Sequence, residues 1–316
     1  MTIAVLGAGA FGTALAIALS QDGEQIVLWA RDEHNAKTMQ ESRLSGPKLP
    51  GPSLPDSLSV TADSSAFDTE ICLLAVPMQK LAMFLAAHPY LNGKTLIACC
   101  KGIDLNTGLG PAQTIAKAFP SSKVALLTGP SFAIDIAQAL PTALVLAAHN
   151  DGVAADIQAK LTRPALRLYR TTDVVGAELG GALKNVVALA AGIAIGAGFG
   201  DSARASVIAR GFAEMSRLAL AREARLETLQ GLSGLGDLVL TCTSEKSRNF
   251  STGVRLGRGD VFDGNATVEG IATAQAIAST TDMDLPLSRA VAAVTLGKID
   301  IATAIQALLA RPVGKE

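Results

Sequence analysis

Lys184 is the residue whose place in the sequence most suggests chemistry. It is the only cation in the apolar run 178–198, and an amide, Asn185, follows it directly. Lysine is rarely buried unless its ammonium meets a charge, a ligand or a cleft, because desolvating the charge is costly. We therefore predict a buried helix that carries a functional lysine. The alternative is a core helix whose lysine reaches the surface from the helix end.

A second group of polar residues interrupts the apolar second half of the chain. Ser247, Arg248 and Asn249 follow one another and offer the hydroxyl, guanidinium and amide donors that bind a phosphate monoester or a carboxylate. Asp237 stands in the glycine-rich stretch 231–243 that precedes them. It is a candidate partner for a lysine ammonium or for a substrate hydroxyl, and its alternative role is that of a helix cap.

A glycine-rich turn near the N-terminus has the spacing of a dinucleotide site. Residues 7–12 read Gly-Ala-Gly-Ala-Phe-Gly and stand between the short apolar run 3–6 and an Ala/Leu-rich segment. In such a strand–turn–helix unit Gly7 permits the tight turn, Gly9 lets the backbone approach a pyrophosphate, and Gly12 lets helix and strand pack closely. The N–H groups at the helix N-terminus then bind the phosphates.

The choice of coenzyme depends on the end of the next predicted strand, 25–29. NAD enzymes usually carry a carboxylate there for the ribose hydroxyls, and this place falls near Arg31 and Asp32. Arg31 is suited to an adenosine 2′-phosphate, so we favour NADPH, with a solvated surface arginine as the alternative. Asp32 keeps NAD as a second candidate.

Three further predicted strands, 71–76, 95–100 and 124–127, end in residues that suit a ligand site. The residues at or just beyond these ends are Pro77, Lys101, Gly129, Ser131 and Ala133. Because ligands of open α/β sheets bind outside the carboxyl ends of the strands, we expect these residues to lie at one site.

These patterns predict an α/β fold, an N-terminal Rossmann-type doubly wound sheet followed by an all-α C-terminal domain. Closing strands are expected at 142–147 and 166–170, whereas 41–57 holds too many Gly and Pro for a regular element. Long Ala/Leu-rich segments then replace the strand patterns. The predicted domains are residues 1–177 for the dinucleotide and residues 178–316 for substrate and catalysis. The expected helices of the second domain are 178–198, 204–223, 268–280, 286–296 and 299–310.

Composition narrows the function classes. The 316 residues are 49% hydrophobic and 17% charged with a net charge of −1, which excludes disorder and the basic face of a nucleic-acid-binding protein. The longest uncharged run falls short of the roughly 20 apolar residues of a membrane span, and no basic signal-peptide region is visible. The four cysteines and three histidines lack zinc-site spacing. We expect free thiols, no metal and a cytoplasmic protein.

Read in order, these residues resemble the bacterial NAD(P)-dependent glycerol-3-phosphate dehydrogenases, and the resemblance covers nearly the whole chain. The segments that carry it are 7–14, 28–31, 75–77, 101–103, 129–133, 180–185, 234–238, 247–249 and 268–270. The chain departs from the family pattern at Ala10, Ile195, Ser202 and Met78–Gln79, none of which is a candidate catalytic group.

The resemblance implies reversible hydride transfer between C2 of sn-glycerol 3-phosphate and C4 of the nicotinamide of NADP or NAD. Dihydroxyacetone phosphate is then the ketone, and the reaction feeds glycerophospholipid synthesis. The implied proton donor and acceptor is Lys184. The predicted substrate-binding residues are Lys101, Gly129, Ser131, Lys184, Asn185, Asp237, Thr241, Ser247, Arg248 and Asn249. The predicted cofactor-binding residues are Gly7, Gly9, Ala10, Phe11, Gly12, Arg31, Pro77, Lys101, Ala133, Arg248 and Glu269.

The chemistry also follows from the residue types. Oxidising a secondary alcohol by hydride loss requires a base, and an amine whose pKa is lowered by desolvation or a neighbouring cation can act near neutral pH. Lys184 and Lys101 fit this catalytic role, and in the reducing direction Asn185 or Thr241 is available to orient the ammonium.

Two other classes of protein remain as alternatives. A Rossmann dehydrogenase for hydroxy acids would need a carboxylate clamp in place of residues 247–249. A non-catalytic NAD(P)-sensing protein would have no need of Lys184. The apolar faces of the helical second half are compatible with a homodimer.

Overall fold

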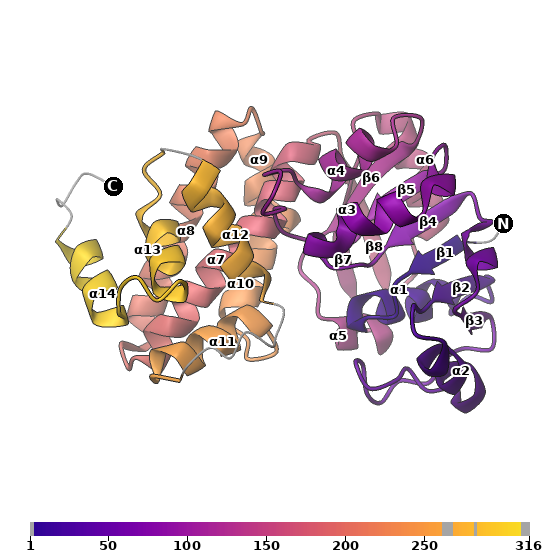
Figure 1. Cartoon of the computed structure of the whole chain (residues 1–316), viewed down its shortest axis with the longest axis horizontal. Helices are drawn as coiled ribbons and strands as arrows, with labels where there is room; N and C mark the ends of the chain where they lie inside the picture. The colour runs from indigo at the N-terminus through magenta and orange to yellow at the C-terminus, as the bar shows by residue number, and fades with distance from the viewer. Residues whose placement is uncertain (1–2, 261–267, 281–282, 311–316) are drawn as a thin grey trace. The chain divides into compact units, whose positions relative to one another are not determined.

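The computed structural model describes residues 3–260, 268–280 and 283–310, and the chain divides into two compact units. Unit 1 comprises Met1–Lys101 and Leu109–Glu178, and unit 2 comprises Gly102–Gly108 and Leu179–Glu316. Figure 1 shows the sheet of unit 1 in indigo to magenta and the helices of unit 2 in pink to yellow. The assignment of coenzyme binding to residues 1–177 and of catalysis to residues 178–316 stays a prediction.

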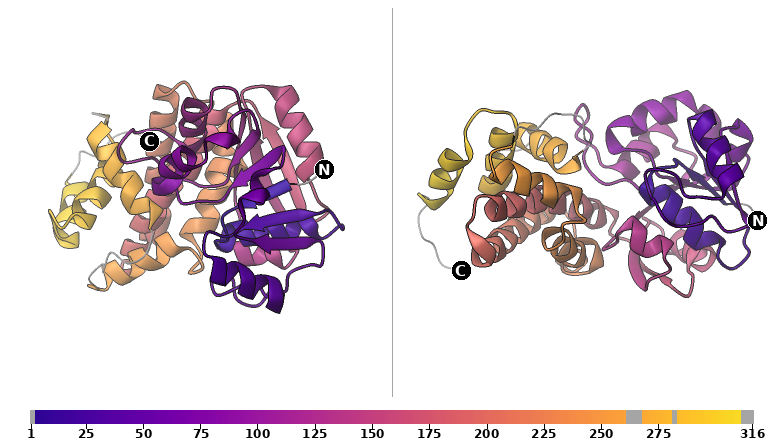
Figure 2. Two further views of the ribbon diagram at one scale, coloured as in Figure 1. Left: turned by 45° about the vertical axis from the view of Figure 1, so that its right-hand side comes forward. Right: turned by 90° about the horizontal axis from the view of Figure 1, so that it is seen from below.

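The described part of unit 1 contains one mixed sheet of eight strands. Figure 2 shows strands of this sheet from two further sides. They are β1 (Ile3–Leu6), β2 (Ile26–Trp29), β3 (Leu58–Thr61), β4 (Ile71–Leu74), β5 (Thr95–Ala98), β6 (Lys123–Thr128), β7 (Thr142–Ala147) and β8 (Leu166–Thr171). Their order is β3-β2-β1-β4-β5-β6-β7-β8, and every neighbouring pair is parallel except β6–β7. The part from β3 to β6 has the strand order of doubly wound dinucleotide folds, which confirms the predicted fold class.

Two features of this sheet differ from the expectation or add to it. β3 was not predicted, because only four residues follow the Gly/Pro-rich excursion 41–57 and their burial alternates along the strand. Within that excursion the pairing observed is an isolated bridge between Leu44 and Ser53, in agreement with the absence of a regular element. The reversed direction of β7 relative to β6 is a further addition.

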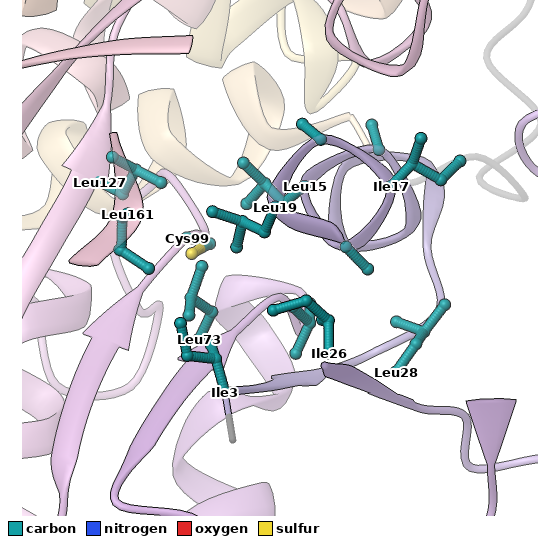
Figure 3. Packing of buried hydrophobic residues seen from close by; sticks show 14 of the residues in the cluster. Ile3, Leu15, Ile17, Leu19, Ile26, Leu28, Leu73, Cys99, Leu127 and Leu161 are labelled. Carbon is teal, nitrogen blue, oxygen red and sulfur yellow. The ribbon is translucent and has the colours of Figure 1, made fainter. Parts of the chain in front are cut away.

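The helices of unit 1 cover the sheet and supply its core. They are α1 (Ala10–Ser20), α2 (Glu33–Ser42), α3 (Met78–Ala87), α4 (Pro111–Ala118), α5 (Ala133–Ala137) and α6 (Asp151–Leu161), with 3-10 turns at Ser64–Phe67 and Pro89–Leu91. Figure 3 shows Leu15 and Leu19 of α1 pointing towards buried sheet residues such as Leu73. Strands β1, β4 and β5 are buried along their whole length, as expected for apolar runs in the middle of a parallel sheet.

The described part of unit 2 is helical. After α7 (Val174–Gly196), which begins in unit 1, come α8 (Gly200–Ala221), α9 (Leu226–Gln230), a π-helix (Leu232–Gly236), α10 (Asp237–Cys242), α11 (Arg248–Gly257), α12 (Glu269–Thr280), α13 (Pro286–Thr295) and α14 (Ile301–Leu309). Among the described helices, α7 alone is long and apolar enough to cross a membrane. Because 78% of its most apolar window is buried inside the protein, α7 is a core helix.

Paired glycines bring α7 and α11 into backbone contact. A Cβ added to Gly192 on α7 would come within 3.0 Å of the Cα of Gly253 on α11 and within 2.1 Å of the Phe250 carbonyl oxygen. One turn further on, a Cβ added to Gly196 would come within 3.0 Å of the Cα of Gly257. Any larger residue at these places would separate the two helices, so their relative position is set by the backbones themselves.

Candidate active site

The glycine turn of unit 1 has the shape that a dinucleotide requires. Gly7 has φ +124°, a conformation that only glycine adopts readily, and a Cβ there would lie 2.6 Å from the Ala75 carbonyl oxygen. A Cβ on Gly12 would lie 2.1 Å from the Gly7 carbonyl oxygen, so α1 packs closely on the turn. A Cβ on Gly9 would meet no atom within 4 Å. Space is therefore left at Gly9, next to the N-terminus of α1, for a pyrophosphate.

The other predicted coenzyme residues of unit 1 stand at the first turns of helices or in loops. Ala10 and Phe11 open α1 and are partly exposed, and Ala133 opens α5. Pro77, which is exposed, is the N-cap of α3 directly after β4 and two linking residues.

Arg31 and Asp32 are both exposed beyond the end of β2. The Asp32 carboxylate accepts a hydrogen bond from the Asn35 backbone N–H at 2.7 Å and so caps α2. The cap occupies one carboxylate oxygen of Asp32, whereas the structure gives Arg31 no such structural role. The exposure of Arg31 fits both the contact with a 2′-phosphate and the solvated surface arginine that is its alternative, so the role of Arg31 stays a prediction.

The ends of β5 and β6 converge on one carbonyl group. The Lys101 Nζ donates to the Gly129 carbonyl oxygen at 3.0 Å, and the Ser131 hydroxyl donates to the same oxygen at 3.3 Å. Gly129 has φ +132°, and a Cβ there would lie 3.2 Å from the Leu144 Cα. Three of the residues predicted at the carboxyl edge are thus brought together by two adjacent strands.

In unit 2, Lys184 is buried and paired. Its Nζ donates to the Asp237 Oδ1 at 2.6 Å and to the Thr241 Oγ1 at 2.8 Å. The side chains of Lys184 and Asp237 are 9% and 1% exposed, so the lysine does not reach the surface. Asp237 is thus a partner of the ammonium, as one of the alternatives predicted, and Gly236 rather than Asp237 is the N-cap of α10. Asp237 thus places an anion beside Lys184.

The glycine-rich stretch before Asp237 sets the place of this carboxylate. Leu232–Gly236 forms a π-helix that leads directly into α10, and π-turns of this kind often stand at functional sites. A Cβ on Gly180 of α7 would lie 2.5 Å from the Ser233 carbonyl oxygen, so α7 and the π-helix are in close contact. A Cβ on Gly234 would lie 2.0 Å from the Leu229 carbonyl oxygen, so this glycine lets the π-helix pack closely on α9.

The three donors at the start of α11 have different surroundings. Arg248 is exposed, whereas Ser247 and Asn249 are buried. The Ser247 hydroxyl accepts from the Phe250 N–H at 3.2 Å and caps α11. The Asn249 Nδ2 donates to the Asn185 Oδ1 at 3.0 Å. Arg248 is thus the exposed residue of the three. Ser247 and Asn249 make hydrogen bonds within unit 2. The Asn185 side chain is bonded to Asn249, whereas the sequence suggested that it could orient Lys184.

Glu269, at the start of α12, is a predicted coenzyme residue in unit 2, together with Arg248. Burial raises the pKa of its carboxyl to about 7, and the positive charge of Arg248 opposes this shift. Its Oε2 has no hydrogen-bond partner among the described residues, and neither has the hydroxyl of Thr273 one turn further along α12. The sequence analysis did not select Thr273. A hydroxyl four residues after Glu269 in an apolar helix could have indicated that the two side chains share one face of that helix.

The four cysteines are free thiols, as predicted, and Cys242 lies next to Thr241. Burial raises the pKa of the Cys242 thiol to about 12, so the thiol is neutral and not a nucleophile near neutral pH. Among residues 3–260, 268–280 and 283–310, no three or more His, Cys, Asp or Glu side chains gather as metal ligands.

The doubly wound sheet with its glycine turn, together with a helical unit that holds a buried lysine, defines the class of dinucleotide-dependent dehydrogenases. Residues 2–154 match the N-terminal and residues 173–306 the C-terminal part of the NAD-dependent glycerol-3-phosphate dehydrogenase family. The chain therefore belongs to the NAD(P)-dependent glycerol-3-phosphate dehydrogenases, and it is an oxidoreductase that uses NAD(P).

Individual relatives agree with this family. The chain is 53% identical to glycerol-3-phosphate dehydrogenase [NAD(P)+] of Ruegeria sp. over 100% of both chains. It is also 53% identical to the Cereibacter sphaeroides enzyme of the same description, over 99% of this chain and 100% of that one. The solved structure of glycerol-3-phosphate dehydrogenase from Coxiella burnetii superposes with a TM-score of 0.92 at 32% identity, covering 98% of this chain and 99% of that one.

A more distant likeness concerns the fold alone. A D-mandelate dehydrogenase structure with NADH superposes with a TM-score of 0.64 at 15% identity, over 94% of this chain and 98% of that one. The first alternative considered from the sequence, a hydroxy-acid dehydrogenase, thus shares the architecture but not the family.

Proposed function

We propose that this chain interconverts sn-glycerol 3-phosphate and dihydroxyacetone phosphate with NADP(H) or NAD(H), and that Lys184 carries the proton. The observation that carries this proposal is the buried Lys184 ammonium held between Asp237 and Thr241 at 2.6 and 2.8 Å. The bound nicotinamide would supply the hydride acceptor in one direction and the hydride donor in the other. The proposed role in the cell is the supply of glycerophospholipid synthesis in the cytoplasm.

Lys184 has different tasks in the two directions. In alcohol oxidation its neutral amine accepts the hydroxyl proton, and in ketone reduction its ammonium polarises the carbonyl group and returns the proton. The Asp237 carboxylate compensates the positive charge that forms on the amine. Thr241 accepts from Lys184 while its own hydroxyl lies 2.6 Å from the Asp237 carbonyl oxygen, so its lone pair is directed at the ammonium.

The phosphate group of the substrate is assigned to the start of α11. Arg248 is exposed there and offers a planar, bidentate donor pair to a phosphate. Ser247 and Asn249 are assigned to the substrate with Arg248, at the N-terminus of the same helix. From unit 1 we assign Lys101, Gly129 and Ser131 to the substrate, with Lys101 as a second catalytic residue.

The coenzyme is assigned to the glycine turn and to six further positions, among which Lys101 and Arg248 are also assigned to the substrate. Gly7, Gly9 and Gly12 shape the turn, and the open space at Gly9 supports a pyrophosphate there. Ala10, Phe11, Pro77, Ala133 and Glu269 are assigned as lining residues. Arg31 is assigned to the 2′-phosphate of NADPH, which we propose as the preferred coenzyme.

The direct test is the oxidation of NADPH by the purified chain with dihydroxyacetone phosphate as substrate, followed by absorbance. Turnover is expected, and it should be faster than with NADH. Pyruvate and other keto acids without a phosphate group should give little turnover. Faster turnover of a keto acid would favour the hydroxy-acid alternative, and tight NADPH binding without any turnover would favour a sensing protein.

A homodimer is proposed on the basis of unit 2. Phe199, Leu220 and Leu296 of unit 2 are large, apolar and exposed. Light scattering of the purified chain should give twice the monomer mass.

A further inference from the structure

The amide of Asn249 ties three helices of unit 2 together. Its Nδ2 donates to the Asn185 Oδ1 on α7 at 3.0 Å, and its Oδ1 accepts from the Gly270 backbone N–H on α12 at 2.9 Å. Asn185 and Asn249 are only 5% and 9% exposed. Water therefore cannot easily replace either bond, and both are expected to persist in the folded protein.

The position of Asn249 relative to α7 is rigid. α11 lies against α7 through the paired glycines Gly192–Gly253 and Gly196–Gly257, where backbone meets backbone. Such a contact leaves no long side chains that could adjust, so Asn249 and Asn185 keep a constant geometry.

The first turn of α12 depends on Asn249 for its place. The first N–H groups of a helix have no partner within the helix, and the Asn249 oxygen supplies one for Gly270. A Cβ on Gly270 would lie 2.5 Å from the Asn185 carbonyl oxygen and 2.8 Å from the Asn249 Oδ1. Glycine is thus required here for α12 to approach the two amides.

Each tied residue directly follows a charged residue to which a function is assigned above. The three pairs in the chain are Lys184–Asn185, Arg248–Asn249 and Glu269–Gly270. Arg248 also acts electrostatically on Glu269, because its charge lowers the pKa of that carboxyl against the effect of burial. The hydrogen bonds therefore join the backbone segments that carry the proton-transferring, the anion-binding and the coenzyme-binding side chains.

We propose that Asn249 is a positioning residue that couples substrate binding to coenzyme binding through its bonds to Asn185 and Gly270. A phosphate bound by Arg248 acts on the turn of α11 whose Asn249 holds the first turn of α12, and with it Glu269. Conversely, a coenzyme bound by Glu269 fixes the first turn of α12 against the same turn of α11. This inference rests on the proposed function, because it takes glycerol 3-phosphate and NADPH as the two ligands.

The test uses NADPH together with glycerol 3-phosphate, a pair that cannot react because both are reduced. The dissociation constant of NADPH is measured by fluorescence without and with saturating glycerol 3-phosphate. Wild-type protein should bind NADPH more tightly in the presence of the substrate, by roughly 5-fold or more, as is usual for coupled sites. Because the ratio is taken at saturation, it reports the coupling and not the substrate affinity.

Gly270→Ala is the informative variant, because it removes none of the charged or amide side chains. It only pushes α12 away from Asn185 and Asn249. The ratio of the NADPH dissociation constants without and with glycerol 3-phosphate should fall to about one, the value for uncoupled sites. Gly152→Ala is the matched control, since Gly152 is likewise the second residue of a helix after an acidic residue. A Cβ there would lie 3.1 Å from the Asn150 side-chain oxygen, and the variant should keep the wild-type ratio.

A second variant keeps the inference testable if Gly270→Ala does not fold. Asn249→Ala deletes both bonds and should also abolish the coupling, and the double variant with Gly270→Ala should show no further loss. The inference would be overturned if the wild-type protein gave a ratio of one. It would also be overturned if either folded variant kept the ratio of the wild-type protein. Turnover of dihydroxyacetone phosphate by the wild-type protein tests the proposed function separately, so the two failures are distinguishable.

Discussion

The Nζ of Lys184 lies 2.6 Å from the Oδ1 of Asp237, and both side chains are almost fully buried. The two residues are 53 positions apart in the chain and come from different helices, α7 and α10. A buried ion pair is costly to form, and it becomes strongly destabilising when only one partner is removed. This pair is therefore better explained by function than by stability. Mutations of one or both partners can separate the effect on activity from the effect on stability.

Lys184→Met should lower kcat by about 10² to 10⁴, the usual share of a positioned proton transfer. It should also destabilise the fold by roughly 3–5 kcal/mol, because the Asp237 carboxylate remains buried without its charge partner. Measurements of kcat and of the melting temperature test both parts. The double variant Lys184→Met/Asp237→Leu should recover most of the stability but none of the activity, and near-wild-type kcat in either variant would refute the mechanism.

Gly9→Val and Gly12→Val should separate coenzyme binding from folding. A Cβ at Gly9 meets no atom within 4 Å apart from its chain neighbours, so the first variant should melt like the wild type and yet fail to bind NADPH. A side chain at Gly12 collides with the Gly7 carbonyl oxygen at 2.1 Å, so the second variant should also lose stability. Fluorescence titration and thermal melting are the measurements, and unchanged NADPH affinity in Gly9→Val would remove the coenzyme assignment.

Arg31→Glu should raise the KM for NADPH far more than the KM for NADH, because it places a carboxylate where the 2′-phosphate is assigned. Steady-state rates with both coenzymes measure the ratio. Arg167→Glu, at an exposed position of β8 in the same unit, makes the same change of charge and should leave the ratio unaltered. An equal effect of both variants would show that Arg31 acts only through the net charge.

Glu178 should make the stability depend on pH. Its carboxylate accepts from the Ala112 N–H at 2.6 Å, and burial raises its pKa from 4.5 to about 7. The unfolded chain therefore releases this proton at lower pH than the folded protein does. The contribution of the group is fully present below pH 4.5 and is lost as the pH rises through about 7, by about 3 kcal/mol in all.

Melting curves from about pH 5 to about pH 9 should show this loss in the wild type. Glu178→Gln keeps an acceptor oxygen but cannot ionise, so its melting temperature should fall less over the same range. Parallel curves for the two proteins would mean that Glu178 does not titrate in this window.

Much of the fold and of the candidate site could be predicted from the sequence because both are encoded locally. The turn 7–12 needs glycine at specified places, and the apolar runs that became β1, β4, β5 and β6 are short and bounded by turn residues. Lys184 stood out because a single charge in an apolar helix is visible without any structure. The strand ends at Lys101 and Gly129 could be placed together since parallel neighbours end at the same edge.

The tertiary structure decided which hydrogen-bond partners the polar residues have. Asp237 had three candidate roles in the sequence, and only the packing of the π-helix against Gly180 places it at Lys184. Asp32 proved to be a helix cap, and Asn249 proved to join residues 64 and 21 positions away. The physical reason is that periodicity and turn chemistry act over a few residues, whereas the partner of a buried polar group is chosen by which helices the folded backbone brings within about 3 Å.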